Sequence, residues 1–212
     1  MSIETTPAGI ERSGVGATEP GSPVEAPAGG RRQGRHTARW IAGSVLLVLA
    51  ALVALLATRP PATATEVYTP LLGKPAPAIT GTTITGGGFR LAAYRGRWVV
   101  LNFFASWCPP CQQEEPNLVT FAYQNRGIGD AALIGVVYDD TTANALSFEK
   151  SAGATWPTVV DPGGQIALRY GLRGPPETFL ISPAGKVEAH IDGPLTVAYL
   201  DQQLAAARTA GP

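Results

Sequence analysis

The only two cysteines of the chain, Cys108 and Cys111, are separated by two prolines in the sequence Trp107-Cys108-Pro109-Pro110-Cys111. Two thiols at this spacing can close a disulfide with little backbone movement and can exchange it with another protein. An apolar run over residues 98–104 precedes the pair, and a segment with helical character follows it. A C-x-x-C at the junction of a strand and a helix is typical of a redox site, so we predict a reversible Cys108–Cys111 disulfide.

The two sulfurs are expected to have different roles. Exchange requires a thiolate, and Cys108 falls where the helix begins, so unpaired backbone N–H groups and the helix dipole favour a negative charge there. Cys111 lies one turn further into the helix. We therefore predict that Cys108 is the exposed, attacking thiol and that Cys111 resolves the mixed disulfide. The alternative is a static bond that only stiffens the turn, which would stabilise little because the closed loop is small.

The segments around the cysteines alternate between strand and helix patterns. Apolar or β-branched runs predict strands over residues 89–91, 98–104, 132–138, 158–160, 178–181 and 186–191. Helical patterns cover residues 109–125, 142–152 and 165–170, and a last helix carries Val197, Leu200, Leu204 and Ala207 on one face. The loop over 182–185 is short enough to require an antiparallel pair of strands. We predict one α/β domain with a mixed central sheet flanked by helices, and with the cysteines at the carboxyl end of a central strand.

The N-terminal part of the chain has a different character. Residues 40–57 form an uncharged, largely apolar segment of 18 residues, which as a helix would extend about 27 Å, close to the thickness of a bilayer core. Arginines are concentrated before this segment and few follow it, which favours a cytoplasmic N-terminus. We predict a disordered cytoplasmic tail (1–39), a single-pass membrane anchor (40–57), a linker (58–72), an extracytoplasmic folded domain (73–208) and a short tail (209–212). The alternative is a signal peptide cleaved near Ala62-Thr63-Ala64.

The charges of the chain balance, with 16 Lys and Arg against 16 Asp and Glu. This balance does not predict a nucleic-acid partner. A structural zinc site needs four ligands. Apart from the two cysteines, the chain offers only two histidines, His36 and His190. We therefore predict neither a metal site nor a cofactor.

Three motifs give the chain a resemblance to a known family. Residues 99–111 read VVLNFFASWCPPC, Pro116 follows five residues later, and residues 170–181 read YGLRGPPETFLI. Over residues 70–208 the chain resembles the membrane-anchored, extracytoplasmic thioredoxin-like reductases of the TlpA/ResA/CcmG (DsbE) type. The resemblance implies a thioredoxin-like fold with an N-terminal extension and an inserted helix region over residues 139–156.

The resemblance also implies roles for individual residues. The catalytic residues would be Cys108, Cys111, Glu114 and Pro176, and the substrate-binding residues would be Trp107, Pro175 and Glu177. Glu114 would lie beside the thiols and relay a proton, and Pro176 would be a cis-proline that faces them. Pro175 departs from the family, because without an N–H it cannot form one of the two backbone bonds expected with an extended substrate. Glu115 is expected to be a solvated acid.

These features predict a thiol:disulfide oxidoreductase. By resemblance, it would reduce disulfides of apocytochrome c or other extracytoplasmic proteins during cytochrome c maturation, and a transmembrane thiol reductant would supply its electrons. Alternatives are an oxidising or general disulfide exchanger and a copper-delivery protein that uses Cys108, Cys111 and His190. A peroxidase would need Pro and Thr in place of Leu101 and Ala105. In a pure binding module the thiols would be incidental.

Overall fold

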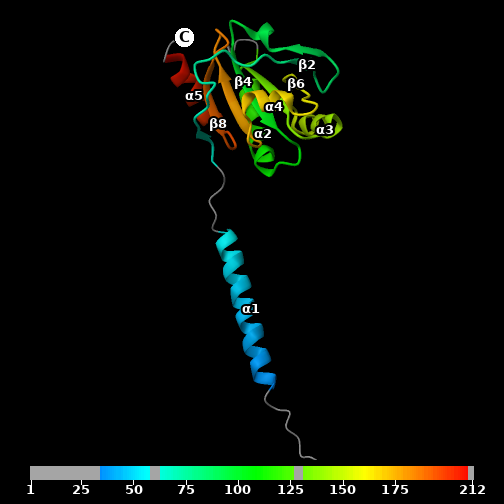
Figure 1. The fold of residues 1–212 in the computed structure, drawn as a ribbon, viewed down its shortest axis with the longest axis vertical. Coiled ribbons are helices and arrows are strands. Elements are labelled where there is room, and N and C mark those ends of the chain that lie inside the picture. Colours follow the sequence, from blue (N-terminus) through cyan, green and yellow to red (C-terminus); the bar gives the residue numbers. More distant parts are fainter. Residues whose placement is uncertain (1–33, 58–62, 127–130, 210–212) are drawn as a thin grey trace, which may run out of the picture. The chain divides into compact units, whose positions relative to one another are not determined.

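The computed structural model describes residues 34–57, 63–126 and 131–209 (Figure 1). The chain divides into two compact units, one ending at Arg59 and one beginning at Pro60. Most of the predicted disordered tail (1–39) and of the C-terminal tail (209–212) lies outside the described residues.

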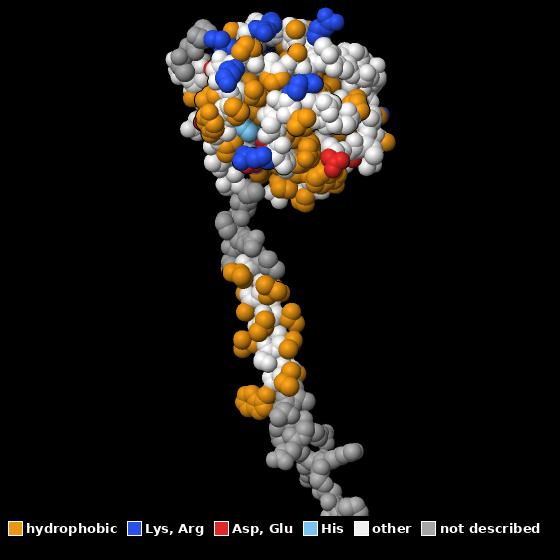
Figure 2. Space-filling model, viewed as in Figure 1, with side chains coloured by type: hydrophobic (Ala, Val, Ile, Leu, Met, Phe, Trp, Pro, Cys, Tyr) orange, Lys and Arg blue, Asp and Glu red, His pale blue; other side chains and the backbone are white. Residues whose placement is uncertain are grey.

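The first unit contains one described helix, α1 (Gly34–Ala57). Figure 2 shows apolar side chains along α1, and Trp40, Leu46 and Val53 are among those exposed. In the part of the chain that the structure describes, no helix is long and apolar enough to cross a membrane. The predicted anchor over 40–57 falls within α1 and stays a prediction.

The second unit is a mixed sheet with helices on both faces. Its strands are β1 (Thr65–Glu66), β4 (Trp98–Phe104), β5 (Ala131–Val137), β6 (Thr158–Val159), β7 (Glu177–Ile181) and β8 (Val187–Asp192), in the order β1-β8-β7-β4-β5-β6. The strand β4 is parallel to β5, and β5 to β6, whereas β7 runs antiparallel to both β4 and β8. The predicted mixed sheet and the antiparallel pair around 182–185 are therefore confirmed.

The helices of this unit are α2 (Pro109–Gln124), α3 (Thr142–Ala152), α4 (Gln165–Tyr170) and α5 (Val197–Thr209). A separate two-stranded sheet of β2 (Thr80–Thr82) and β3 (Gly88–Arg90) is followed by a 3-10 helix over Leu91–Tyr94. The predicted inserted region over 139–156 contains α3, which connects β5 to the edge strand β6.

The side chains of β4 alternate between the two faces of the sheet, and the face decides which helices each side chain contacts. All seven residues of β4 are buried, and successive side chains point to opposite faces of the sheet. Val99, Leu101 and Phe103 pack in the core with α4. Trp98 and Val100 pack in the core beneath α2 and α5. Asn102 shares the face of Trp98 and Val100, so its polar side chain points toward α2.

The boundary predicted for the folded domain is wrong at its N-terminal side. Within the expected linker (58–72), β1 pairs with β8 in the register Thr65↔Asp192, and Leu72 forms a bridge with Val187. The Val67 N–H donates to the His190 carbonyl at 2.8 Å. The edge of β8 leaves backbone groups that need partners, and this segment supplies them despite its proline content.

Candidate active site

The C-x-x-C pair lies where β4 ends and α2 begins, as predicted. Cys108 is the N-cap residue of α2, and Pro109 and Pro110 occupy the first two helical positions, where a missing N–H costs no helical hydrogen bond. The two sulfurs form a disulfide. The Cys111 N–H points at Cys108 Sγ, at an N···S distance of 3.2 Å. Because this amide stabilises negative charge on Cys108, the geometry favours Cys108 as the thiolate.

The predicted exposure of Cys108 is wrong for this oxidised structure. The exposed fraction is 2% for Cys108 and 1% for Cys111. Both cysteines pack in a small core cluster with Phe104, Val137 and Ala145. The sequence could not show this cover, because β5 and α3 supply it from a later part of the chain. In this oxidised state, attack on the disulfide by a thiol of a second protein therefore requires local opening at the site.

The second segment at the disulfide is the loop before β7. The Pro175–Pro176 peptide bond is cis, as predicted for Pro176. The carbonyl oxygen of Pro175 lies 3.5 Å from Cys108 Sγ. Pro175 is half-buried and Pro176 is buried. The structure thus brings the C-x-x-C and this loop together, while the role of Pro175 in substrate binding stays a prediction.

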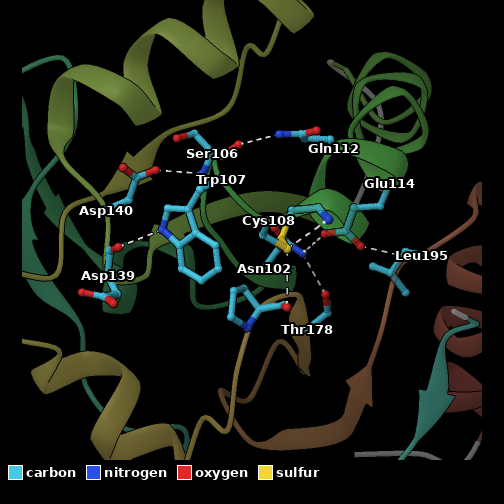
Figure 3. The surroundings of a disulfide bond; sticks show 12 residues. Asn102, Ser106, Trp107, Cys108, Gln112, Glu114, Asp139, Asp140, Thr178 and Leu195 are labelled. Carbon is cyan, nitrogen blue, oxygen red and sulfur yellow. Dashed lines mark hydrogen bonds between the residues drawn. A yellow bond between two sulfur atoms is a disulfide. The ribbon is translucent and has the colours of Figure 1, made fainter. Parts of the chain in front are cut away.

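Trp107, which the resemblance implies to be a substrate-binding residue, lies at the surface, and its role in substrate binding stays a prediction. Its side chain is 53% exposed, and its Nε1 donates to the Asp139 carbonyl at 2.9 Å. The neighbouring Ser106 N–H donates to Asp140 Oδ2 at 2.8 Å (Figure 3). The loop that follows β5 therefore fixes the loop that carries the indole. No local sequence pattern indicates this contribution of Asp139 and Asp140.

Glu114 is buried on the helix turn that follows Cys111. Its Oε1 accepts a hydrogen bond from Asn102 Nδ2 at 2.8 Å, and its Oε2 accepts one from the Leu195 N–H at 2.9 Å (Figure 3). The same Asn102 amide donates to Thr178 Oγ1 at 3.1 Å. Burial raises the pKa of Glu114 to about 7, against the lowering effect of the bonds from Leu195 and Asn102. A carboxyl that titrates near neutral pH can accept and return a proton, which is the role predicted for it.

The prediction that Glu115 is solvated is wrong. Glu115 is 4% exposed, and its Oε1 is buried without a hydrogen-bond partner among the described residues. Burial, followed by the nearby carboxyls of Glu149 and Glu114, raises its pKa to about 8. Glu149 accepts a hydrogen bond from Thr158 Oγ1, and burial raises its pKa to about 7. The packing of α2 against the sheet and α3, which the sequence does not reveal, buries both acids.

Glu177 lies at the start of β7 and is buried, so its carboxylate faces inward. Its Oε1 accepts hydrogen bonds from the N–H groups of Arg173 and Gly174, at 2.8 Å and 3.0 Å. Its Oε2 lies 2.5 Å from His190 Nε2. Burial alone would raise the pKa of Glu177, but the hydrogen bonds from His190, Arg173 and Gly174 outweigh it and the net pKa is lowered. This position favours a role in holding the loop, and substrate binding by Glu177 stays a prediction.

The ligand set of the copper-delivery alternative is not assembled. His190 uses Nε2 for Glu177 and stacks on Phe179, with ring centroids 4.1 Å apart. Within the residues that the structure describes, no group of three or more His, Cys, Asp or Glu side chains could hold a metal ion.

Comparison with known proteins agrees with this geometry. Residues 72–190 match the AhpC/TSA family. The chain is a thioredoxin-like thiol-disulfide oxidoreductase of this family. The oxidoreductase is 34% identical to the thiol-disulfide oxidoreductase ResA of Geobacillus thermodenitrificans over 142 residues, covering 66% of this chain and 80% of that protein. It is 37% identical to the thiol:disulfide interchange protein HelX of Rhodobacter capsulatus over 131 residues, covering 60% of this chain and 72% of that protein.

Solved structures support the same fold. The oxidoreductase resembles the crystal structure of a DsbE-type thiol:disulfide interchange protein from Chlorobium tepidum, with a TM-score of 0.58 and 33% identity. The match covers 64% of this chain and 96% of that one. The predicted thioredoxin-like fold and family are therefore confirmed.

Proposed function

We propose that the oxidoreductase reduces disulfides of extracytoplasmic proteins, and that oxidised apocytochrome c is its substrate. The observation that carries disulfide exchange is the Cys111 N–H, 3.2 Å from Cys108 Sγ, because this donor favours the thiolate that exchange requires in either direction. The reductive direction is what the resemblance to the ResA and CcmG group implies. The cytochrome c substrate rests on the resemblance to the ResA and CcmG group.

The chemistry proceeds in two exchanges. The Cys108 thiolate attacks one sulfur of the substrate disulfide, a Cys108–substrate bond forms, and the other substrate sulfur leaves as a thiolate. The Cys111 thiolate then attacks Cys108 Sγ, which closes the Cys108–Cys111 disulfide and releases the second substrate thiol. Two electrons pass to the substrate, and Glu114 takes up or returns the proton of a thiol. A transmembrane thiol reductant would then return two electrons to the oxidised pair.

A peptide competition tests the substrate. The reduced domain should reduce an oxidised C-x-x-C-H peptide, the pattern to which haem is attached in c-type cytochromes, faster than a peptide with the same disulfide but with His replaced by Ala. The reduction potential of the Cys108–Cys111 couple should also lie below the glutathione range. Equal rates on the two peptides would remove cytochrome c as the preferred substrate. A potential well above that of glutathione would instead favour the oxidising alternative.

We also propose that residues 40–57 anchor the protein in the cell membrane, with the redox domain outside the cytoplasm. The support is the uncharged segment and the arginines that precede it. Tagged full-length protein should stay in the membrane fraction after a high-salt wash. Recovery only in the culture supernatant, with an N-terminus near Thr65, would show that the segment is a cleaved signal peptide.

A further inference from the structure

The turn before Pro175 is held by one carboxylate oxygen. Glu177 Oε1 accepts the N–H groups of Arg173 at 2.8 Å and Gly174 at 3.0 Å. These residues come directly before Pro175, whose carbonyl oxygen is 3.5 Å from Cys108 Sγ. The Glu177 carboxylate therefore helps to place this carbonyl relative to the attacking sulfur, together with the ion pair between Arg173 and Asp192 and the Gly193 N–H, which donates to the Pro176 carbonyl at 3.0 Å.

The other oxygen of this carboxylate is held by a histidine on the neighbouring strand. His190 lies on β8 opposite Phe179 of β7, and its ring stacks on that phenyl ring at an interplanar angle of 10°. His190 Nε2 lies 2.5 Å from Glu177 Oε2. The side chains of His190 and Glu177 are only 4% and 1% exposed. Water therefore cannot readily replace either partner.

We propose that His190 is a positioning residue for thiol–disulfide exchange: it orients Glu177, which holds the turn at Arg173 and Gly174 and so places the Pro175 carbonyl against Cys108. The proposal concerns the oxidoreductase activity itself. It does not depend on apocytochrome c being the substrate.

Loss of the His190 contact would leave a buried carboxylate oxygen unpaired, which is costly. The carboxyl would then bind a proton or turn away from β8, and in either case it would accept the Arg173 and Gly174 N–H groups less well. In the reduced protein the Pro175 carbonyl can accept the Cys108 S–H, which favours the protonated thiol. Releasing the turn removes that acceptor, so the pKa of the Cys108 thiol falls. It also disorders the loop on which substrate is expected to dock.

Three variants separate positioning from packing. His190→Leu fills the space but has no donor, whereas His190→Gln keeps an amide N–H. Phe179→Leu removes the ring stack while leaving His190 and Glu177 in place. For each reduced variant, the Cys108 thiol is titrated by the ultraviolet absorbance of the thiolate, and KM and kcat are measured with a model disulfide protein.

We expect His190→Leu to lower the thiol pKa and to raise KM about tenfold, the scale of one hydrogen bond to a charged group. His190→Gln should restore most of both values. Phe179→Leu should lower the melting temperature while leaving the thiol pKa and KM unchanged. If His190→Leu changes thiol pKa and KM no more than Phe179→Leu does, His190 only packs the core and the proposal fails. If His190→Leu does not fold, His190→Asn, which is polar but shorter, replaces it and must show the same two changes.

Discussion

Replacing Cys108 by Ser should reduce disulfide exchange to the rate of the uncatalysed reaction, whereas replacing Cys111 by Ser should stop the reaction after its first step. The serine hydroxyl is not ionised at neutral pH, so the Cys108→Ser variant has no nucleophile at the N-cap of α2. The Cys111→Ser variant keeps the attacking sulfur next to its amide donor but cannot resolve the product. It should therefore accumulate mixed disulfides with its substrates.

Non-reducing gel electrophoresis followed by mass spectrometry measures both outcomes. Mixed disulfides with substrate proteins should be abundant with Cys111→Ser and absent with Cys108→Ser. Dithiothreitol should reduce them and release the substrates. The double variant is the matched control for association without a covalent bond. Equal trapping by the two single variants would contradict the assignment of roles, and no trapping by either would favour a static disulfide.

The folded redox domain should lose stability as the pH rises from about 5 to about 8, because three buried carboxyls keep their protons longer in the folded state. The pKa values of Glu114, Glu115 and Glu149 are raised from 4.5 to about 7, 8 and 7. The unfolded chain releases these protons near pH 4.5, so above that value the folded state binds more protons than the unfolded state. The contribution of these three carboxyls to the free energy of unfolding is fully present below their pKa in the unfolded chain. It is lost as the pH rises through their pKa in the folded state, and the loss is on the order of a few kcal/mol.

Glu177 acts in the opposite direction. Although burial alone would raise the pKa of Glu177, its hydrogen bonds lower the net value. Its contribution to the free energy of unfolding is therefore present above its pKa in the unfolded chain and is lost as the pH falls through its pKa in the folded state. This loss belongs to the acidic side of the stability curve. It does not offset the decline predicted between about pH 5 and about pH 8.

Glu115 offers the sharpest variant, because its Oε1 is buried without a partner among the described residues. Glu115→Gln cannot ionise, so it should raise the free energy of unfolding near pH 8 and change it little near pH 5. Urea unfolding at the two pH values measures this, with Asp201→Asn on the exposed side of α5 as the control. A wild-type domain that gains stability across this range, or a Glu115→Gln effect of equal size at both pH values, would contradict the account.

Local sequence signals were sufficient for most of the sheet. The predicted strand over 98–104 coincides with β4, because seven consecutive residues are buried in the centre of the sheet. The helices α3 and α4 also begin and end as predicted. The strands β1 and β2 were missed, because they are short, polar and exposed and their pairing depends on distant partners.

The candidate site was predictable where a motif carried it and was missed where tertiary packing decided it. The C-x-x-C at the strand–helix junction and the cis bond before Pro176 follow from recognisable motifs. The burial of Cys108 and Glu115 depends on elements that pack over α2 from later in the chain. The contact between His190 and Glu177 depends on the register of β7 and β8, which no local pattern specifies.

Limited alkylation of the reduced domain tests most directly whether Cys108 is the attacking sulfur. A sub-stoichiometric amount of iodoacetamide is added over a series of pH values, and the modified cysteine is identified by peptide mass spectrometry. Cys108 should be modified first, and its reaction should persist below the pH at which an ordinary thiol stops reacting. Preferential modification of Cys111, or protection of both sulfurs in the reduced protein, would contradict the assignment of Cys108 as the attacking sulfur.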